Sequence, residues 1–149
     1  MDIKFMNAAL SEAKKAFEIG ETPIGAVIVK DDKIIARAYN RRETKKNALM
    51  HAEISAIDKA CRKLGGWRLC GCDMYVTLEP CPMCAGAIIQ ARIENVFFGA
   101  YDNKAGAFGS TCDLSGLLAH KVKATGGILE EQSSEIIKRF FKKLRKKEI

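Results

Sequence analysis

The sequence predicts an α/β fold in which a sheet lies between layers of helices, formed by one domain over residues 1–149. A chain of 149 residues is long enough for one domain and leaves little room for two. Along it, segments with apolar residues at helical spacing alternate with short runs of β-branched and aromatic residues. Such alternation is typical of a sheet with helices on its faces.

The first half of the chain predicts a helix, a hairpin and a second helix. Residues 3–20 carry small and aromatic apolar residues at helical intervals and end at a glycine. The segment 23–40 holds two β-rich runs around Asp31, Asp32 and Lys33, which is a hairpin pattern. Residues 49–66 predict the second helix, which ends at two glycines. Its expected buried stripe is Ile54, Ile57, Cys61 and Leu64.

The second half predicts strands and helices in alternation. Residues 73–78 read as a short buried strand, and 81–91 as a helix whose start follows Pro80. Strands are expected at 95–101 and 120–127, separated by a glycine-rich loop that begins at residue 102. A last helix runs from about 130 to 149. Its expected buried stripe is Ile136, Ile137, Phe140, Phe141 and Leu144.

The net charge of +7 is concentrated at the C-terminus. Residues 138–149 contain seven basic residues and one acidic residue, so six of the net positive charges lie in this segment. The rest of the chain is nearly neutral. A basic helical tail is either a solvated helix end or a contact for phosphates.

We expect a cytoplasmic protein that does not enter a membrane. No apolar stretch approaches the length of a membrane span, and residues 1–20 lack the apolar core of a signal peptide. Thiols stay reduced in the cytoplasm, so the six cysteines do not predict a disulfide framework. Four of them are scattered and are expected to be small buried residues. These are Cys61, Cys70, Cys72 and Cys112.

The other two cysteines, Cys81 and Cys84, are three positions apart at the start of a predicted helix. A helix N-terminus favours the thiolate, which is the form that binds metal or attacks a disulfide. The pair alone fits both a metal clamp and a redox pair. His51 also stands at a helix start and supplies a third donor. Three protein ligands are typical of catalytic zinc sites, which leave a fourth position for water.

Glu53 stands two residues after His51, beside the predicted metal site. Zinc lowers the pKa of a water molecule that it binds to roughly 7, and a neighbouring carboxylate can take that proton and return it to a leaving group. Taken singly, a histidine at a helix start can be a cap and a glutamate there can complement the dipole. The combination of H-x-E with P-C-x-x-C is, however, the signature of zinc-dependent deaminases.

Longer stretches of the sequence resemble the bacterial tRNA-specific adenosine deaminases, within the cytidine deaminase-like superfamily. The similar segments cover nearly the whole chain and include PIGAVIV, YNRRET, HAEISAI, TLEPCPMCAGA, GAYDNKAGAFGS and FFKKLR. The resemblance implies a three-layer α/β/α fold with a five-stranded mixed sheet, one zinc ion per chain and a homodimer. It also implies hydrolytic conversion of adenosine to inosine at the wobble position of an anticodon stem-loop, typically of an arginine tRNA.

The resemblance also implies a role for individual residues. His51, Cys81 and Cys84 match the zinc ligands of the family, and Glu53 matches its proton shuttle. The expected substrate contacts are Asn40, Asp102, Lys104, Phe140 and Phe141. Without the family, Asn40 and Asp102 could be turn residues, and at least one of the two phenylalanines is expected to pack in the core.

The chain departs from the family pattern near the expected substrate rim. The departures are at residues 47–50, before His51, at Tyr101 and Phe108, and within the segment 113–122. Two alternatives stay open. One is a deaminase of a free nucleobase or nucleoside, of the guanine or cytosine type. The other is a non-catalytic, zinc-stabilised RNA-binding module, which Glu53 disfavours.

Overall fold

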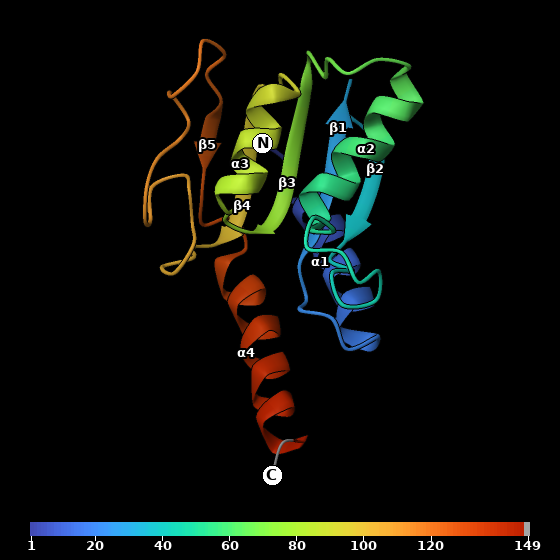
Figure 1. The fold of residues 1–149 in the computed structure, drawn as a ribbon, viewed down its shortest axis with the longest axis vertical. Helices are drawn as coiled ribbons and strands as arrows, with labels where there is room; N and C mark the ends of the chain where they lie inside the picture. Colours follow the sequence, from blue (N-terminus) through green and yellow to red (C-terminus); the bar gives the residue numbers. More distant parts are fainter. Residues whose placement is uncertain (148–149) are drawn as a thin grey trace.

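The structure is a computed structural model that describes residues 1–147, so the last two residues of the predicted C-terminal helix lie outside the described part. The order of helices and strands is the order that the sequence predicts (Figure 1). The elements are α1 (Ile3–Glu18), β1 (Gly25–Lys30), β2 (Lys33–Tyr39), α2 (Ala52–Leu64), β3 (Cys72–Leu78), α3 (Pro82–Gln90), β4 (Asn95–Ala100), β5 (Lys123–Thr125) and α4 (Glu130–Lys147).

The five strands form one mixed sheet in the order β2-β1-β3-β4-β5. Strand β1 runs antiparallel to both β2 and β3, whereas β3, β4 and β5 are parallel to one another. Strands β2, β3, β4 and β5 therefore all end at the same edge of the sheet. Loops that follow parallel strands meet at such an edge, which is where α/β folds bind ligands.

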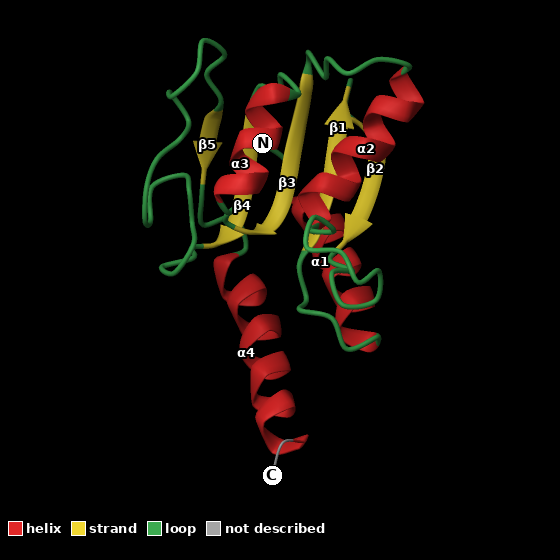
Figure 2. Ribbon diagram, in the orientation of Figure 1, coloured by secondary structure: helices red, strands yellow, loops and turns green. Residues whose placement is uncertain are grey.

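Helices cover both faces of the sheet and complete the predicted three-layer α/β/α arrangement. Helices α2 and α3 lie on the face turned toward the viewer in Figure 2, and α1 lies on the opposite face, where Phe5, Met6 and Ala9 pack against Val27 and Tyr75. Helix α4 contacts β4, β3 and α1 and then extends past the edge at which the strands end (Figure 1). Among residues 1–147, none of the helices combines the length and the apolar character that a membrane span requires.

The hairpin turn between β1 and β2 forms where the sequence predicts it. Asp31 and Asp32 have φ angles of 50° and 60°. Two successive positive φ values are the mark of the type I′ turn, whose twist matches that of the flanking strands.

The buried face of α2 differs from the predicted stripe. The helix buries Ala52, Ala56 and Ala60, together with Glu53, while Leu64 is 39% exposed. Short alanine side chains let the helix approach the sheet closely, so the larger residues lie at the sides of the contact. The scattered cysteines were also predicted wrongly for the most part. Of these four, only Cys72 is buried, Cys61 is half-buried, and Cys70 and Cys112 are exposed.

Candidate active site

Two helix N-termini meet at the edge where the strands end, and each supplies a potential metal ligand. His51 is the N-cap of α2 and Cys81 is the N-cap of α3, both with extended backbone angles. Neither side chain caps its own helix, so both are free to point elsewhere. Pro82 takes the first position of α3, where a missing N–H costs nothing. Cys84 lies in the first turn of α3 and is buried.

These three side chains converge to the geometry of a tetrahedral metal site. The Sγ atoms of Cys81 and Cys84 lie 3.7 Å and 3.5 Å from Nδ1 of His51, and all three donor atoms lie within 4.8 Å of one another. Ligands at ordinary Zn–S and Zn–N distances around a tetrahedral zinc ion stand about 3.6 Å apart. The donor set and its spacing therefore fit zinc, with three protein ligands.

The three groups influence one another's protonation. Hydrogen bonding with Cys84 lowers the pKa of the Cys81 thiol to about 4 against the effect of burial, and His51 adds to this lowering. The same hydrogen bond and burial raise the pKa of Cys84, and the hydrogen bond with Cys81 raises the pKa of His51 despite burial. Protons are thus shared within the cluster, and a divalent cation that binds there displaces them.

Glu53 reaches the same place because His51 lies outside the helix. On a regular helix two residues two positions apart point about 200° away from each other. His51 has φ −72° and ψ 155°, so this helical angle does not apply. Glu53 is only 4% exposed. Burial raises its pKa from 4.5 to about 7, although its own backbone N–H and the charge of His51 act in the opposite direction.

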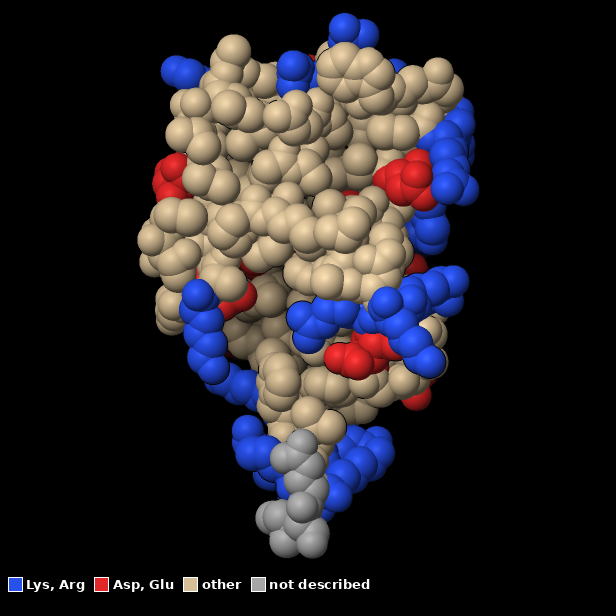
Figure 3. Space-filling model, in the orientation of Figure 1, with Lys and Arg blue, Asp and Glu red and all other residues tan. Residues whose placement is uncertain are grey.

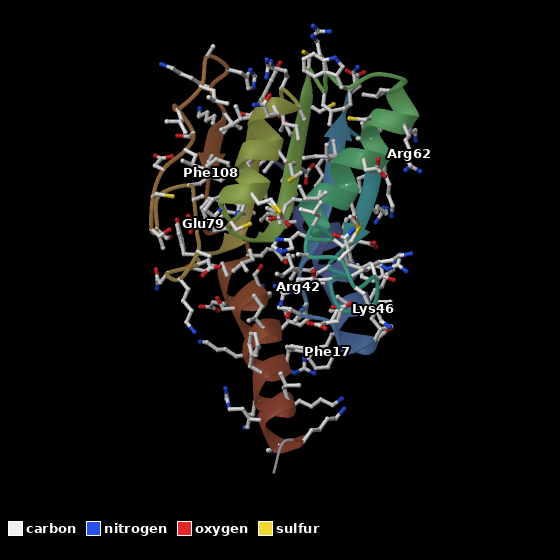
Figure 4. All side chains as sticks on the ribbon, in the orientation of Figure 1. Phe17, Arg42, Lys46, Arg62, Glu79 and Phe108 are labelled. Carbon is white, nitrogen blue, oxygen red and sulfur yellow. The ribbon has the colours of Figure 1, made fainter. Side chains whose placement is uncertain are left out.

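A cavity of about 740 Å³ opens onto this cluster. It is bounded by the segments that follow β2, β3 and β4, by the first turn of α2 and by one side of α4. Figure 3 shows the surface hollowed here, where α4 leaves the body of the molecule, with basic side chains at the rim. Figure 4 labels two lining residues, Arg42 after β2 and Glu79 at the end of β3. The volume is in the range of small-molecule and cofactor sites.

Most of the expected substrate contacts lie around this cavity. Asn40, Asp102, Lys104 and Phe141 line it together with His51, Glu53 and Cys81. Phe140 does not lie among its described lining residues. It is 8% exposed, and its ring lies 6.0 Å from that of Phe17 and 5.3 Å from that of Phe141.

Asn40 and Asp102 also shape their own loops. The side chain of Asn40 donates to the carbonyl of Thr22 and accepts from the N–H of Arg42. The carboxylate of Asp102 accepts from the N–H groups of Lys104 and Ala105. Both residues are therefore turn residues as well as cavity residues, so the two interpretations are compatible.

The positions that depart from the family pattern lie in different surroundings. Tyr101 lines the cavity and packs edge-on against Phe98 at 5.2 Å. Phe108 is buried in the core. The side chain of Asn47 accepts from the N–H of Leu49, which is 54% exposed. Of these substitutions, Tyr101 is the one that the structure places on the cavity wall.

Sequence reasoning missed two buried carboxylates near the cavity, Glu21 and Glu79. Glu21 is 1% exposed and accepts from the N–H groups of Glu43 and Thr44 at 3.2 and 2.6 Å. Glu79 is 2% exposed and is surrounded by donors of the segment after β4. The available signal was a glutamate directly after a buried strand and directly before Pro80 and Cys81.

Comparison with known proteins places this site in a family. Residues 2–145 match the MafB19-like deaminase family. The chain is 50% identical to a tRNA-specific adenosine deaminase of Bacillus subtilis (strain 168), over 98% of this chain and 92% of that protein.

Solved structures of two kinds of deaminase match this chain. One of them, from a study of A-to-I editing by tRNA:A34 deaminases at the wobble position of transfer RNA, matches with a TM-score of 0.85 and 44% identity, over 91% of this chain and 99% of that one. The guanine deaminase of Bacillus subtilis matches with a TM-score of 0.65 and 44% identity, over 68% of this chain and 66% of that one.

Proposed function

The chain belongs to the family of tRNA-specific adenosine deaminases, and we propose that it hydrolyses adenosine to inosine at the wobble position of a tRNA anticodon. Hydrolytic deamination is supported by the arrangement of His51, Cys81 and Cys84 beside the buried Glu53, on one wall of a cavity. The choice of tRNA as the substrate is supported by the relatives, which are tRNA-specific and match nearly the full length of the chain.

His51, Cys81 and Cys84 would hold one zinc ion per chain. Their distances suit tetrahedral ligation, and two thiolates with one imidazole suit zinc better than hard cations. When bound, zinc supplies Lewis acidity and makes water nucleophilic at neutral pH. Ligation needs reduced thiols, so the proposal also places the protein in the cytoplasm.

Glu53 would act as the proton shuttle. Its pKa of about 7 lets it both accept and donate a proton near neutral pH, which is the condition for efficient general acid–base catalysis. Glu53 would take one proton from the attacking water and pass it to N1 of adenine. It would then pass the second proton, from the hydroxyl now bonded to C6, to the amine that leaves. Adenosine and water are thereby converted to inosine and ammonia.

The cavity and its rim would receive a nucleotide taken out of its stack. Turning a base out costs least in a single-stranded loop, and an anticodon loop provides such bases. Asn40, Asp102, Lys104 and Phe141 line the cavity and are proposed substrate contacts. Phe140 would contribute by supporting the ring of Phe141.

Helix α4 would contact the phosphates of the RNA. It carries basic residues on exposed positions in its last turns and borders the cavity through Lys138. Cations that neutralise phosphates release counterions and make binding depend on salt. The family resemblance supports an anticodon stem-loop of an arginine tRNA as the substrate.

A homodimer is part of the proposal. In the view of Figure 3, the middle of the face on which α3 lies shows almost no lysine, arginine or acidic residue, while α2 carries charged residues such as Asp58 and Arg62. An uncharged surface of this kind suits a second copy of the chain. Light scattering of the purified protein tests this part, and a monomer at micromolar concentration would contradict it.

The decisive experiment is incubation with an anticodon stem-loop that carries adenosine at the wobble position, followed by measurement of inosine. The similarity to guanine deaminase makes free guanine the appropriate competing substrate. Added salt separates the two, because RNA turnover should weaken steeply and free-base turnover should hardly change. Turnover of guanine without inosine formation would refute the proposed substrate.

A further inference from the structure

The carboxylate of Glu79 is the centre of a dense group of hydrogen bonds at the end of β3. It is 2% exposed. Oε1 accepts from the N–H of Asp102 at 3.1 Å and from the hydroxyl of Ser110. Oε2 accepts from the N–H groups of Phe108 and Ser110 at 3.0 and 3.2 Å. Within residues 1–147, no lysine, arginine or histidine forms an ion pair with it.

All of these donors belong to one segment, residues 101–110, which we call the rim loop. The loop is wrapped around the carboxylate. A Cβ atom on Gly106 would overlap the Glu79 carboxyl group, so only glycine allows the backbone to pass there. The N–H of Ala107 also donates to the carbonyl of Pro80 at 2.8 Å. The course of the rim loop is therefore determined by its contacts with residues 79 and 80.

The rim loop forms one wall of the cavity, and Glu79 connects this wall to the proposed metal site. Tyr101, Asp102 and Lys104 face the cavity from the loop. Only Pro80 separates Glu79 from Cys81 in the chain. The ends of β3 and β4 are adjacent in the sheet, with Leu78 paired to Ala100. One side chain thus holds the substrate wall at a defined position relative to the reacting centre.

We propose that Glu79 is a positioning residue. It fixes the rim loop so that a nucleotide bound against the loop has its base aligned with the proposed metal site. The inference rests on the proposed function, and it concerns how the same cavity binds its substrate. A buried carboxylate held by several N–H donors gives a wall of defined shape, because charge-assisted hydrogen bonds are short and directional. Small displacements of a bound reactant of about 1 Å can cost about 100-fold in rate.

The test uses Glu79→Gln, which keeps the size of the side chain but turns an amide NH₂ toward donors that need an acceptor. The hydroxyl of Ser110 can accept from this NH₂, but either the N–H of Asp102 or those of Phe108 and Ser110 then lack an acceptor. We expect kcat/KM for the wobble-adenosine stem-loop to fall about 10- to 100-fold, because a displaced rim loop weakens nucleotide binding, which raises KM, and misaligns the bound base, which lowers kcat. The zinc content should stay at the wild-type value. Hydrogen exchange at the amides of Asp102, Phe108 and Ser110 should become faster.

Two further variants separate positioning from a general effect on folding. Ser110→Ala removes one of the hydrogen bonds and leaves the carboxylate, so a smaller rise in KM is expected even if the first variant does not fold. Glu12→Gln is the matched control. Glu12 is a 3% exposed carboxylate on α1, where it pairs with Lys15 at 2.7 Å, and it is not among the described residues that line the cavity. It should leave KM and the rim-loop amides unchanged.

The outcomes distinguish this inference from the proposed function. If the wild-type protein forms no inosine, the proposed function is wrong, while faster exchange at the three amides in Glu79→Gln would still support the role of Glu79. If the wild type is active and Glu79→Gln has a wild-type KM with unchanged exchange, the inference is overturned. Loss of zinc from Glu79→Gln, or an equal rise in KM in Glu12→Gln, would also overturn it.

Discussion

Replacing Glu53 by glutamine removes the proposed proton shuttle without changing the size of the side chain. Glu53 is 4% exposed, so an isosteric amide leaves neither a cavity nor an unpaired charge. With a pKa of about 7, the wild-type carboxyl group is present in both protonation states at neutral pH. Glutamine can neither accept the proton of the attacking water nor return it to the leaving amine.

The other two carboxylates among the described cavity-lining residues are already hydrogen-bonded within the protein. Glu79 accepts hydrogen bonds on both oxygens, and Oδ1 of Asp102 accepts from two amides of its own loop. General acid–base catalysis typically contributes about 10²- to 10⁴-fold, and without a substitute the loss should fall in the upper part of this range, about 10³- to 10⁴-fold in kcat.

Single-turnover measurement of inosine on the wobble-adenosine stem-loop gives this loss directly. Elemental analysis of zinc and a binding assay with the same stem-loop should both give wild-type values for Glu53→Gln. If the variant retains zinc and reacts within about 10-fold of the wild type, Glu53 is not the shuttle and the assignment is refuted.

Three further predictions concern stability and RNA binding. Burial raises the pKa of Glu21, but hydrogen bonds from Thr44 and Glu43 lower it below 4.5 overall. Its contribution to folding is therefore present above pH 4.5 and is lost as pH falls through the lower folded pKa. The difference in unfolding free energy between wild type and Glu21→Gln should shrink accordingly in acid denaturation. Gly25→Ala places a Cβ against the backbone of α1 at Ala9 and Ala13, which should cost about 1–3 kcal/mol in urea unfolding; a neutral result would show that α1 can shift freely. Replacing Lys142 and Lys146 by alanine should weaken stem-loop binding and make it less dependent on salt, and an unchanged salt dependence would remove α4 from the RNA interface.

The sequence predicted that His51, Cys81 and Cys84 come together because they stand at or near helix starts, which local patterns locate well. Apolar spacing and a proline place the beginnings of α2 and α3. The short strands that precede or flank those helices then bring His51 and Cys81 to a common sheet edge. The fold class could be predicted for the same reason, since alternation of elements is a local property of the sequence.

The parts that sequence reasoning missed depend on contacts between distant segments. Glu79 is recognised as a buried anchor only through donors from residues 102–110, which lie more than 20 positions away in the chain. The buried face of α2 consists mainly of alanines. A prediction based on the spacing of large apolar residues does not identify such small side chains as the buried face. Phe140 and Phe141 are adjacent, so periodicity cannot decide which one faces the core and which one the cavity.

Zinc content and product formation measured on one preparation test the central claim most directly. The protein, purified without chelators, should contain one zinc ion per chain and should convert the wobble adenosine of an anticodon stem-loop to inosine. Removal of the zinc should abolish this conversion, and its return should restore it. Inosine formation by protein that holds no stoichiometric metal, or in which Cys81 and Cys84 are joined in a disulfide, would contradict the account.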